Sequence, residues 1–211
     1  PRPVTEEPVG KSHSIPNKPS HSPAGGFSLI ELLLVLGVLA ILIVAAFVVY
    51  PQVRDRNQAN SEAVNIRAIQ AGVRTLFQSK PGLYNGLGNG KSASDRGIAN
   101  QARIFPAAMN GGDYSASAEI RTPWGGEVWV WQRPAVTLPT GSFAQGRTFA
   151  ILYEEVPRAL CLPILTAVAS NFQSVTVSNR ETLTAQGFDV NVAASACQSE
   201  SGTVNLMFTS N

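Results

Sequence analysis

The sequence predicts an α+β fold in which one long N-terminal helix packs against an antiparallel β-sheet. Three observations lead to this prediction. An uncharged apolar run covers residues 32–50, apolar residues then recur every three or four positions as far as Phe77, and strand-like segments follow from residue 127. We therefore divide the chain into a leader at 1–26, an apolar helix half at 27–50, an amphipathic helix half at 51–78 and a globular domain at 79–211.

The leader has the composition of a disordered segment. Residues 1–26 contain six prolines, separated mainly by Ser, Asn, His and Lys. Such a stretch cannot bury enough apolar surface to offset the chain entropy that folding removes. The chain begins with Pro1 rather than Met, so we expect the precursor to start further upstream.

The segment 27–50 is long enough to span a membrane. As a helix its 24 residues cover about 36 Å, against about 30 Å for the hydrocarbon core of a bilayer. A buried helix of a soluble protein is the less favoured alternative, because such helices seldom contain so many successive apolar residues. A secretory signal peptide has a shorter apolar region and an Ala-x-Ala-like end, which this segment lacks, so we expect the segment to be retained.

A single carboxylate, Glu31, lies near the start of this apolar segment. An ionisable side chain in a membrane span is costly, and such residues usually have a function. The alternative is structural, because Ser28 and Glu31 have the spacing of a capping box, in which the two side chains bond the free N–H groups of a helix start.

The amphipathic half is recognised by one apolar stripe. Its members lie three or four residues apart, and the charged residues occupy the other faces. Pro51 is expected to kink the junction between the two halves or to unwind it locally. The stripe consists of Ala59, Ala63, Ile66, Ile69, Val73, Leu76 and Phe77.

The globular domain is expected to begin with a long loop at 81–112, which is rich in Gly, Asn and Ser and has at most a short helix around 98–105. A second helix is expected at 157–170, with Pro163 in or near its first turn. Alternating apolar residues predict strands at 127–132, 148–154, 174–178 and 203–209.

Two cysteines, Cys161 and Cys197, lie in this domain. An even number of cysteines beyond a membrane span favours a disulfide and an oxidising compartment, and two free buried thiols are the alternative. Lys and Arg are distributed too evenly on the two sides of the span to orient it. The disulfide interpretation places the domain outside the cytoplasm.

The remaining residues argue against an enzyme. From Phe27 onward the chain contains no histidine, and it has no dinucleotide, P-loop or zinc-protease motif, so we expect no cofactor and no metal. Glu154 and Glu155 are adjacent and are interpreted as surface charges on opposite faces of a strand. Acidic and basic residues nearly balance, which gives no sign of nucleic-acid binding. Trp129 and Trp131 are expected to pack in the core or at a subunit interface.

The segment 26–31, Gly-Phe-Ser-Leu-Ile-Glu, followed by the apolar run, resembles the prepilin signature of type IV pilins. The resemblance implies that a prepilin peptidase cuts between Gly26 and Phe27 and methylates the new N-terminus at Phe27. It also implies that Glu31 is the conserved glutamate that acts in assembly, by pairing with the N-terminal amine of a neighbouring subunit.

Later segments extend the resemblance to type IVb pilins of thin conjugative pili. These segments are 122–128, 149–161 and 197–208, and they include both cysteines. The resemblance implies the pilin fold and a filament of identical subunits, built by an inner-membrane assembly machinery and its ATPase. The subunit is then a single-pass inner-membrane protein before assembly and part of an extracellular pilus afterwards, serving adhesion, aggregation or conjugation. The alternatives are a minor pilin or secretion pseudopilin, and a membrane-anchored binding module or adhesin that does not polymerise.

Overall fold

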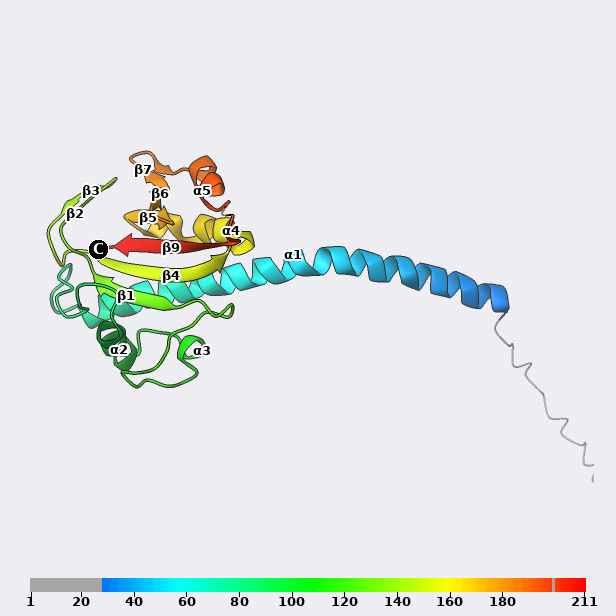
Figure 1. Cartoon of the computed structure of the whole chain (residues 1–211), viewed down its shortest axis with the longest axis horizontal. Coiled ribbons are helices and arrows are strands. Elements are labelled where there is room, and N and C mark those ends of the chain that lie inside the picture. The colour runs from blue at the N-terminus through cyan, green and yellow to red at the C-terminus, as the bar shows by residue number, and fades with distance from the viewer. Residues whose placement is uncertain (1–27, 199) are drawn as a thin grey trace, which may run out of the picture. The chain divides into compact units, whose positions relative to one another are not determined.

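The structure is a computed structural model that describes residues 28–198 and 200–211. The chain divides between Ala46 and Phe47 into two units, which are considered separately. Helix α1 (Leu29–Leu76) contributes to both units, and all strands belong to the second (Figure 1).

The first unit contains the beginning of α1. The helix starts directly after Ser28, whose carbonyl oxygen accepts hydrogen bonds from the backbone N–H groups of Glu31 and Leu32 at 3.0 and 3.1 Å. Leu, Ile, Val and Ala fill the turns that follow, and each of the described side chains from 29 to 46 is exposed. Intrahelical hydrogen bonds satisfy the backbone here without any tertiary packing, as a helix in an apolar medium requires.

In the second unit α1 continues through Pro51, so of the two outcomes expected at this residue, a kink or local unwinding, the unwinding does not occur. Proline has no N–H, and therefore it leaves the carbonyl one turn earlier without its usual partner, but the neighbouring turns remain helical. Five residues of the predicted stripe are at most 2% exposed: Ala59, Ala63, Ile66, Ile69 and Val73. Leu76, also assigned to the stripe, is 44% exposed because it is the last residue of the helix.

The sheet has five antiparallel strands in the order β1-β4-β9-β5-β6. The four strands predicted from the sequence are all present, and the last strand of the chain, β9, lies in the middle of the sheet between β4 and β5 (Figure 1). The bounds are β1 Val128–Gln132, β4 Phe149–Pro157, β5 Ser174–Val177, β6 Arg180–Glu181 and β9 Thr203–Ser210.

Two small hairpins were not predicted. Strand β2 (Val136–Leu138) pairs with β3 (Gly141–Phe143), and β7 (Leu183–Thr184) pairs with β8 (Gly187–Phe188). Strands of two or three residues are too short to show the alternation of apolar and polar residues from which strands are recognised.

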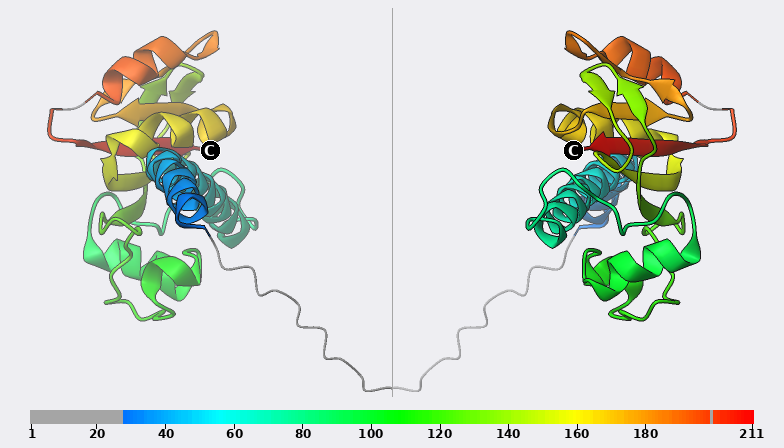
Figure 2. Two further views of the ribbon diagram at one scale, coloured as in Figure 1. Left: turned by 90° about the vertical axis from the view of Figure 1, so that its right-hand side faces the viewer. Right: turned by 90° about the vertical axis from the view of Figure 1, so that its left-hand side faces the viewer.

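The core of the second unit lies between α1 and one face of the sheet (Figure 2). Ile66 and Ile69 of α1 belong to the same buried cluster as Ile151 of β4 and Phe208 of β9, and all four are completely buried. Polar groups reinforce the contact, since Gln70 Nε2 donates to Ser210 Oγ at 2.9 Å. The amphipathic half of α1 is therefore an integral part of the domain core.

The long loop contains two short helices, α2 (Ala93–Gln101) and α3 (Ala107–Asn110), where one was expected around 98–105. Helix α2 ends early because Arg103 adopts a left-handed conformation, with φ of +56°, that a helix cannot continue. Pro106, with no N–H to contribute, then precedes α3.

Helix α4 (Arg158–Val168), extended by a 3₁₀ turn at Ala169–Asn171, occupies the predicted 157–170 segment. Pro163 is the sixth residue of α4 and lies in its second turn, slightly later than expected. A further helix, α5 (Val190–Ala196), was missed. Asp189 caps it by accepting hydrogen bonds from the N–H groups of Asn191 and Val192 at 2.9 and 3.1 Å, so an N-cap residue was the available signal.

Candidate functional site

The apolar half of α1 is the most unusual surface of the described chain. Leu29, Ile41 and Phe47 are 75%, 71% and 75% exposed, and the apolar residues between them are also exposed. By length and composition α1 is the one described helix able to cross a membrane. Soluble proteins rarely expose a continuous apolar surface of this size, so this half requires a lipid or protein environment.

Glu31 lies in the first turn of α1, where the helix dipole favours a negative charge. The capping box that Ser28 and Glu31 could form is not made among residues 28–198 and 200–211: their contact is between the Ser28 carbonyl and the Glu31 N–H. Gly26 and Phe27, the predicted cleavage and methylation positions, lie outside the described residues.

The two cysteines form a disulfide, the pairing that the even cysteine count favoured. Cys161 lies on α4 and Cys197 directly after α5, with their Cα atoms 5.8 Å apart. Both residues are buried. The bond connects α4 to the end of α5 through two cysteines that are 36 residues apart in the sequence, and it removes both thiols from nucleophilic chemistry.

A buried carboxylate that sequence reasoning missed lies on the domain half of α1. Glu62 is 1% exposed, and its Oε2 accepts a hydrogen bond from Asn65 Nδ2 at 3.3 Å. Burial raises the pKa of Glu62, and the Asn65 bond opposes this only in part. The same carboxylate adds to the rise in the pKa of the fully buried Tyr153, which is caused first by burial.

Glu154 is a structural residue, which corrects its interpretation as a surface charge. Its two carboxylate oxygens accept hydrogen bonds from Lys91 Nζ at 2.8 Å and Trp129 Nε1 at 2.9 Å. Lys91 and Arg96 lie over the Trp129 ring, 5.0 and 4.2 Å from its centroid. The loop and α2 are thereby fixed to the sheet, and Trp129 is only 8% exposed. Glu155 is exposed, as predicted.

The Trp-Gly-Gly segment before β1 is also structural. Trp124 Nε1 donates to the Glu154 carbonyl oxygen at 3.3 Å, and Gly125 has a φ of +91°. A Cβ on Gly126 would lie 1.9 Å from the same carbonyl oxygen, so only glycine fits there. The segment thus brings a tight turn against the β-bulge of β4.

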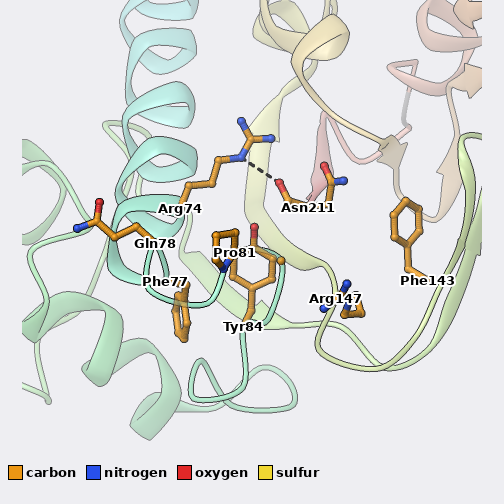
Figure 3. Close-up of a pocket in the computed structure, with 9 residues that line it drawn as sticks. Arg74, Phe77, Gln78, Pro81, Tyr84, Phe143, Arg147 and Asn211 are labelled. Carbon is orange, nitrogen blue, oxygen red and sulfur yellow. Dashed lines mark hydrogen bonds between the residues drawn. The ribbon is translucent and has the colours of Figure 1, made fainter.

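A hollow of 570 Å³ lies beside the end of α1, lined by Arg74, Tyr84, Phe143 and Arg147 among others (Figure 3). The Arg74 side chain points toward Asn211, and its Nε donates to the Asn211 carbonyl oxygen at 2.9 Å. Burial raises the pKa of Tyr84, and Arg74 partly offsets the rise. Arg74 therefore joins α1 to the end of β9, which makes this hollow a structural junction.

Within 28–198 and 200–211, no group of three His, Cys, Asp or Glu side chains is placed to hold a metal ion. The most distinctive feature of the described chain is the exposed apolar surface of α1 at 29–46.

An apolar N-terminal helix that continues into an α+β domain with an antiparallel sheet is the architecture of a type IV pilin. Two family models match the chain: the one described as PilS N terminal matches residues 56–211, and the one described as prokaryotic N-terminal methylation motif matches residues 22–47. The first covers well over half of the chain, so the protein belongs to the PilS family.

Two solved structures are similar at low identity. TcpA, a type IV pilin from Vibrio cholerae El Tor biotype, is 14% identical, with a TM-score of 0.44 over 75% of this chain and 99% of TcpA. The type IVb pilin PilS from Salmonella typhi is 16% identical, with a TM-score of 0.38 over 72% of this chain and 94% of PilS. No curated protein sequence matches the chain.

Proposed function

We propose that this pilin is the structural subunit of a type IVb-like pilus, with no enzymatic activity. The observation that carries the proposal is the exposed apolar surface of α1 at 29–46, next to a domain that has a complete core of its own. Segment 27–50 anchors the subunit in the inner membrane before assembly and becomes the core of an extracellular filament afterwards. The filament serves adhesion, aggregation or conjugation.

Assembly exchanges one apolar environment for another. In the membrane the side chains of 29–46 contact lipid, and in the filament they contact the same segment of other subunits. The hydrophobic effect contributes little to this transfer, so packing and specific polar contacts determine whether subunits associate. Head-to-tail contacts that do not close into a ring give an open helical filament.

Processing precedes assembly. A prepilin peptidase cuts between Gly26 and Phe27 and methylates Phe27, and the inner-membrane assembly machinery with its ATPase then adds the subunit to the filament. The match of the N-terminal methylation motif to residues 22–47 supports the processing step. Replacing Gly26 by Val should block cleavage, because a β-branched side chain adds bulk at a position where glycine lets the chain fit into the protease site. The mass of the membrane form tests this, and a Gly26→Val protein cut normally would contradict it.

Glu31 sets the register between subunits by pairing with the N-terminal amine of Phe27 on a neighbour. A charge in an apolar environment is costly when unpaired, so the pairing offsets its cost only in the correct axial position. Glu31→Gln should therefore give a processed, folded and membrane-inserted subunit that forms few or no filaments. Asp55→Asn, which removes a charge from the same helix outside the apolar run, is the matched control and should assemble normally.

The measurement is the yield of sheared filaments at equal membrane levels of the subunit. Normal filament yield from both Glu31→Gln and Glu31→Val would refute the role of the carboxylate. A subunit that dominates sheared material is a major pilin, whereas a trace amount indicates a minor pilin or a pseudopilin. Complete absence of the wild-type chain from sheared material would identify a membrane-anchored module that does not polymerise.

A further inference from the structure

The two tryptophans of β1 have different surroundings. Trp129 and Trp131 are two residues apart on one strand, so their side chains lie on the same face of the sheet, opposite the core. Trp129 is covered by Lys91 and Arg96. Trp131 is half-buried, and among residues 28–198 and 200–211 its indole makes no hydrogen bond, ring contact or cation contact. The Trp131 indole N–H is therefore free to donate a hydrogen bond to a ligand.

A hollow of 250 Å³ lies at Trp131 on this outer face. Its apolar floor consists of Trp131, Leu152 and Met207, which come from three neighbouring strands, β1, β4 and β9. Its rim is made of uncharged polar residues. These are Thr176, Ser178, Asn179 and Asn205.

The rim is held in place by the turn between β5 and β6. Ser178 and Asn179 have φ of +48° and +72°, the conformation of a tight two-residue hairpin turn. The Ser178 N–H donates to the Asn205 carbonyl oxygen at 2.8 Å, and Asn205 Oδ1 accepts from the Glu155 N–H at 3.1 Å. The backbone of the rim is therefore fixed before any ligand arrives.

Several polar groups on this fixed rim have no partner among the described residues. They are the Thr176 hydroxyl, the Asn179 carboxamide and the Nδ2 group of Asn205. Together they offer both donors and acceptors beside the apolar floor. The Arg133 guanidinium lies at the edge of the floor: its Nη1 contacts Met207 Sδ at 3.8 Å and donates to Thr209 Oγ1 at 3.0 Å, which holds it in place.

We propose that this hollow binds a neutral pyranose, a single uncharged sugar ring at the end of a glycan. One face of a pyranose is formed by C–H groups and stacks on an indole ring, while its hydroxyl groups require both donors and acceptors at the rim. A lining without charged residues matches an uncharged ligand, because a charged one would be desolvated without compensation. The volume is below the range of drug-sized pockets and fits one ring rather than an extended chain.

The test uses the full chain in a zwitterionic detergent without a sugar headgroup, so that the detergent cannot occupy the site. Saturation-transfer NMR is recorded with methyl galactoside, methyl glucoside and N-acetylglucosamine, and with glucuronic acid as the charged comparison. A ligand of this size is expected to have a dissociation constant on the order of 1 mM. The C–H face of at least one neutral sugar should receive saturation, and glucuronic acid should not.

Two variants and one control locate the site. Trp131→Leu keeps an apolar side chain but removes the ring, and it should weaken binding by about tenfold. Asn179→Gly keeps the positive φ but removes the carboxamide, and it should weaken binding several-fold. Phe143→Leu, a matched aromatic replacement on the β2–β3 hairpin outside this hollow, should bind as the wild type does.

Urea unfolding checks that each variant is folded. If Trp131→Leu is not folded, the sugar binding of Asn179→Gly alone tests whether the hollow is the binding site. The proposal is overturned if no neutral sugar binds, if glucuronic acid alone binds, or if folded Trp131→Leu and Asn179→Gly both bind like the wild type. The test involves no filament, so its result is independent of whether the chain assembles into a pilus.

Discussion

The two halves of α1 share one continuous helix but differ in how their apolar side chains are covered. In the half at 29–46 all described side chains are exposed, whereas Ile66 and Ile69 in the domain half have no exposed surface. Each half also contains a distinctive carboxylate: Glu31 lies in the exposed half, and Glu62 is buried in the domain core.

The comparison shows that apolar composition alone does not determine burial. The domain half has one apolar stripe and finds its partner in the sheet of the same chain. The other half is apolar on every side, so packing against one sheet face would leave most of its apolar side chains exposed. Only surroundings on all sides, such as lipid or a bundle of helices, cover it. The chain thus combines a domain that is complete in itself with a segment that is incomplete without an assembly or a membrane.

The largest expected effect on stability is at the buried stripe. Ile69→Ala should destabilise the domain by about 2–5 kcal/mol, because it leaves a cavity in a closely packed core. Leu36→Ala, a similar truncation in the exposed half, should leave domain stability unchanged. The unfolding free energy of both variants is measured by urea unfolding in detergent, monitored by tryptophan fluorescence. All three tryptophans lie in the domain, so the signal reports on the domain alone. Equal losses of unfolding free energy in Ile69→Ala and Leu36→Ala would contradict the statement that only the domain half of α1 is packed in the core.

Removal of the disulfide should have a comparable or slightly smaller effect. Replacing Cys161 and Cys197 together by Ser should lower the unfolding free energy by about 2–4 kcal/mol, because the unfolded chain regains the entropy of the open loop. The helicity of the apolar half in detergent should not change, since the bond joins α4 to α5 within the domain. Circular dichroism together with urea unfolding separates the two effects, and a loss of helicity before the domain unfolds would contradict this prediction.

A smaller, pH-dependent effect is expected at Glu62. Because burial raises its pKa in the folded state, the unfolded chain loses this proton first as the pH rises above about 4.5. The wild-type domain should therefore lose stability relative to Glu62→Gln from about pH 4.5 up to the folded pKa, and Glu62→Gln should be the more stable at pH 7. Thermal unfolding of both proteins from pH 4 to 8 measures the difference. A difference that does not change with pH would show that Glu62 titrates normally.

The smallest effect on unfolding is expected at Glu31. Glu31→Gln changes an exposed side chain outside the domain core, so domain stability should stay within about 0.5 kcal/mol of the wild type. The same variant is expected to lose filaments. Glu31 is thus expected to affect assembly but not domain stability, whereas Glu62 is expected to affect domain stability. Loss of domain stability in Glu31→Gln would mean that poor assembly reflects poor folding.

The sequence by itself determined both halves of α1, the four main strands and α4. These elements rest on local periodicity over many residues, which is visible without knowledge of partners. The signature at 26–31 likewise rests on residues next to one another in the chain. At Pro51 the sequence left two outcomes open, a kink or local unwinding. The structure decides against unwinding, because the helical turns on both sides outweigh one missing hydrogen bond.

Only the tertiary structure decided what surrounds each side chain. It buried Glu62, bonded Glu154 to Lys91 and Trp129, and placed β9 between β4 and β5. It also gave Trp129 and Trp131 different surroundings, although they alternate identically along β1. The reason is physical: burial and pairing depend on contacts between residues far apart in the sequence, and no local pattern encodes which distant segment will cover a given face.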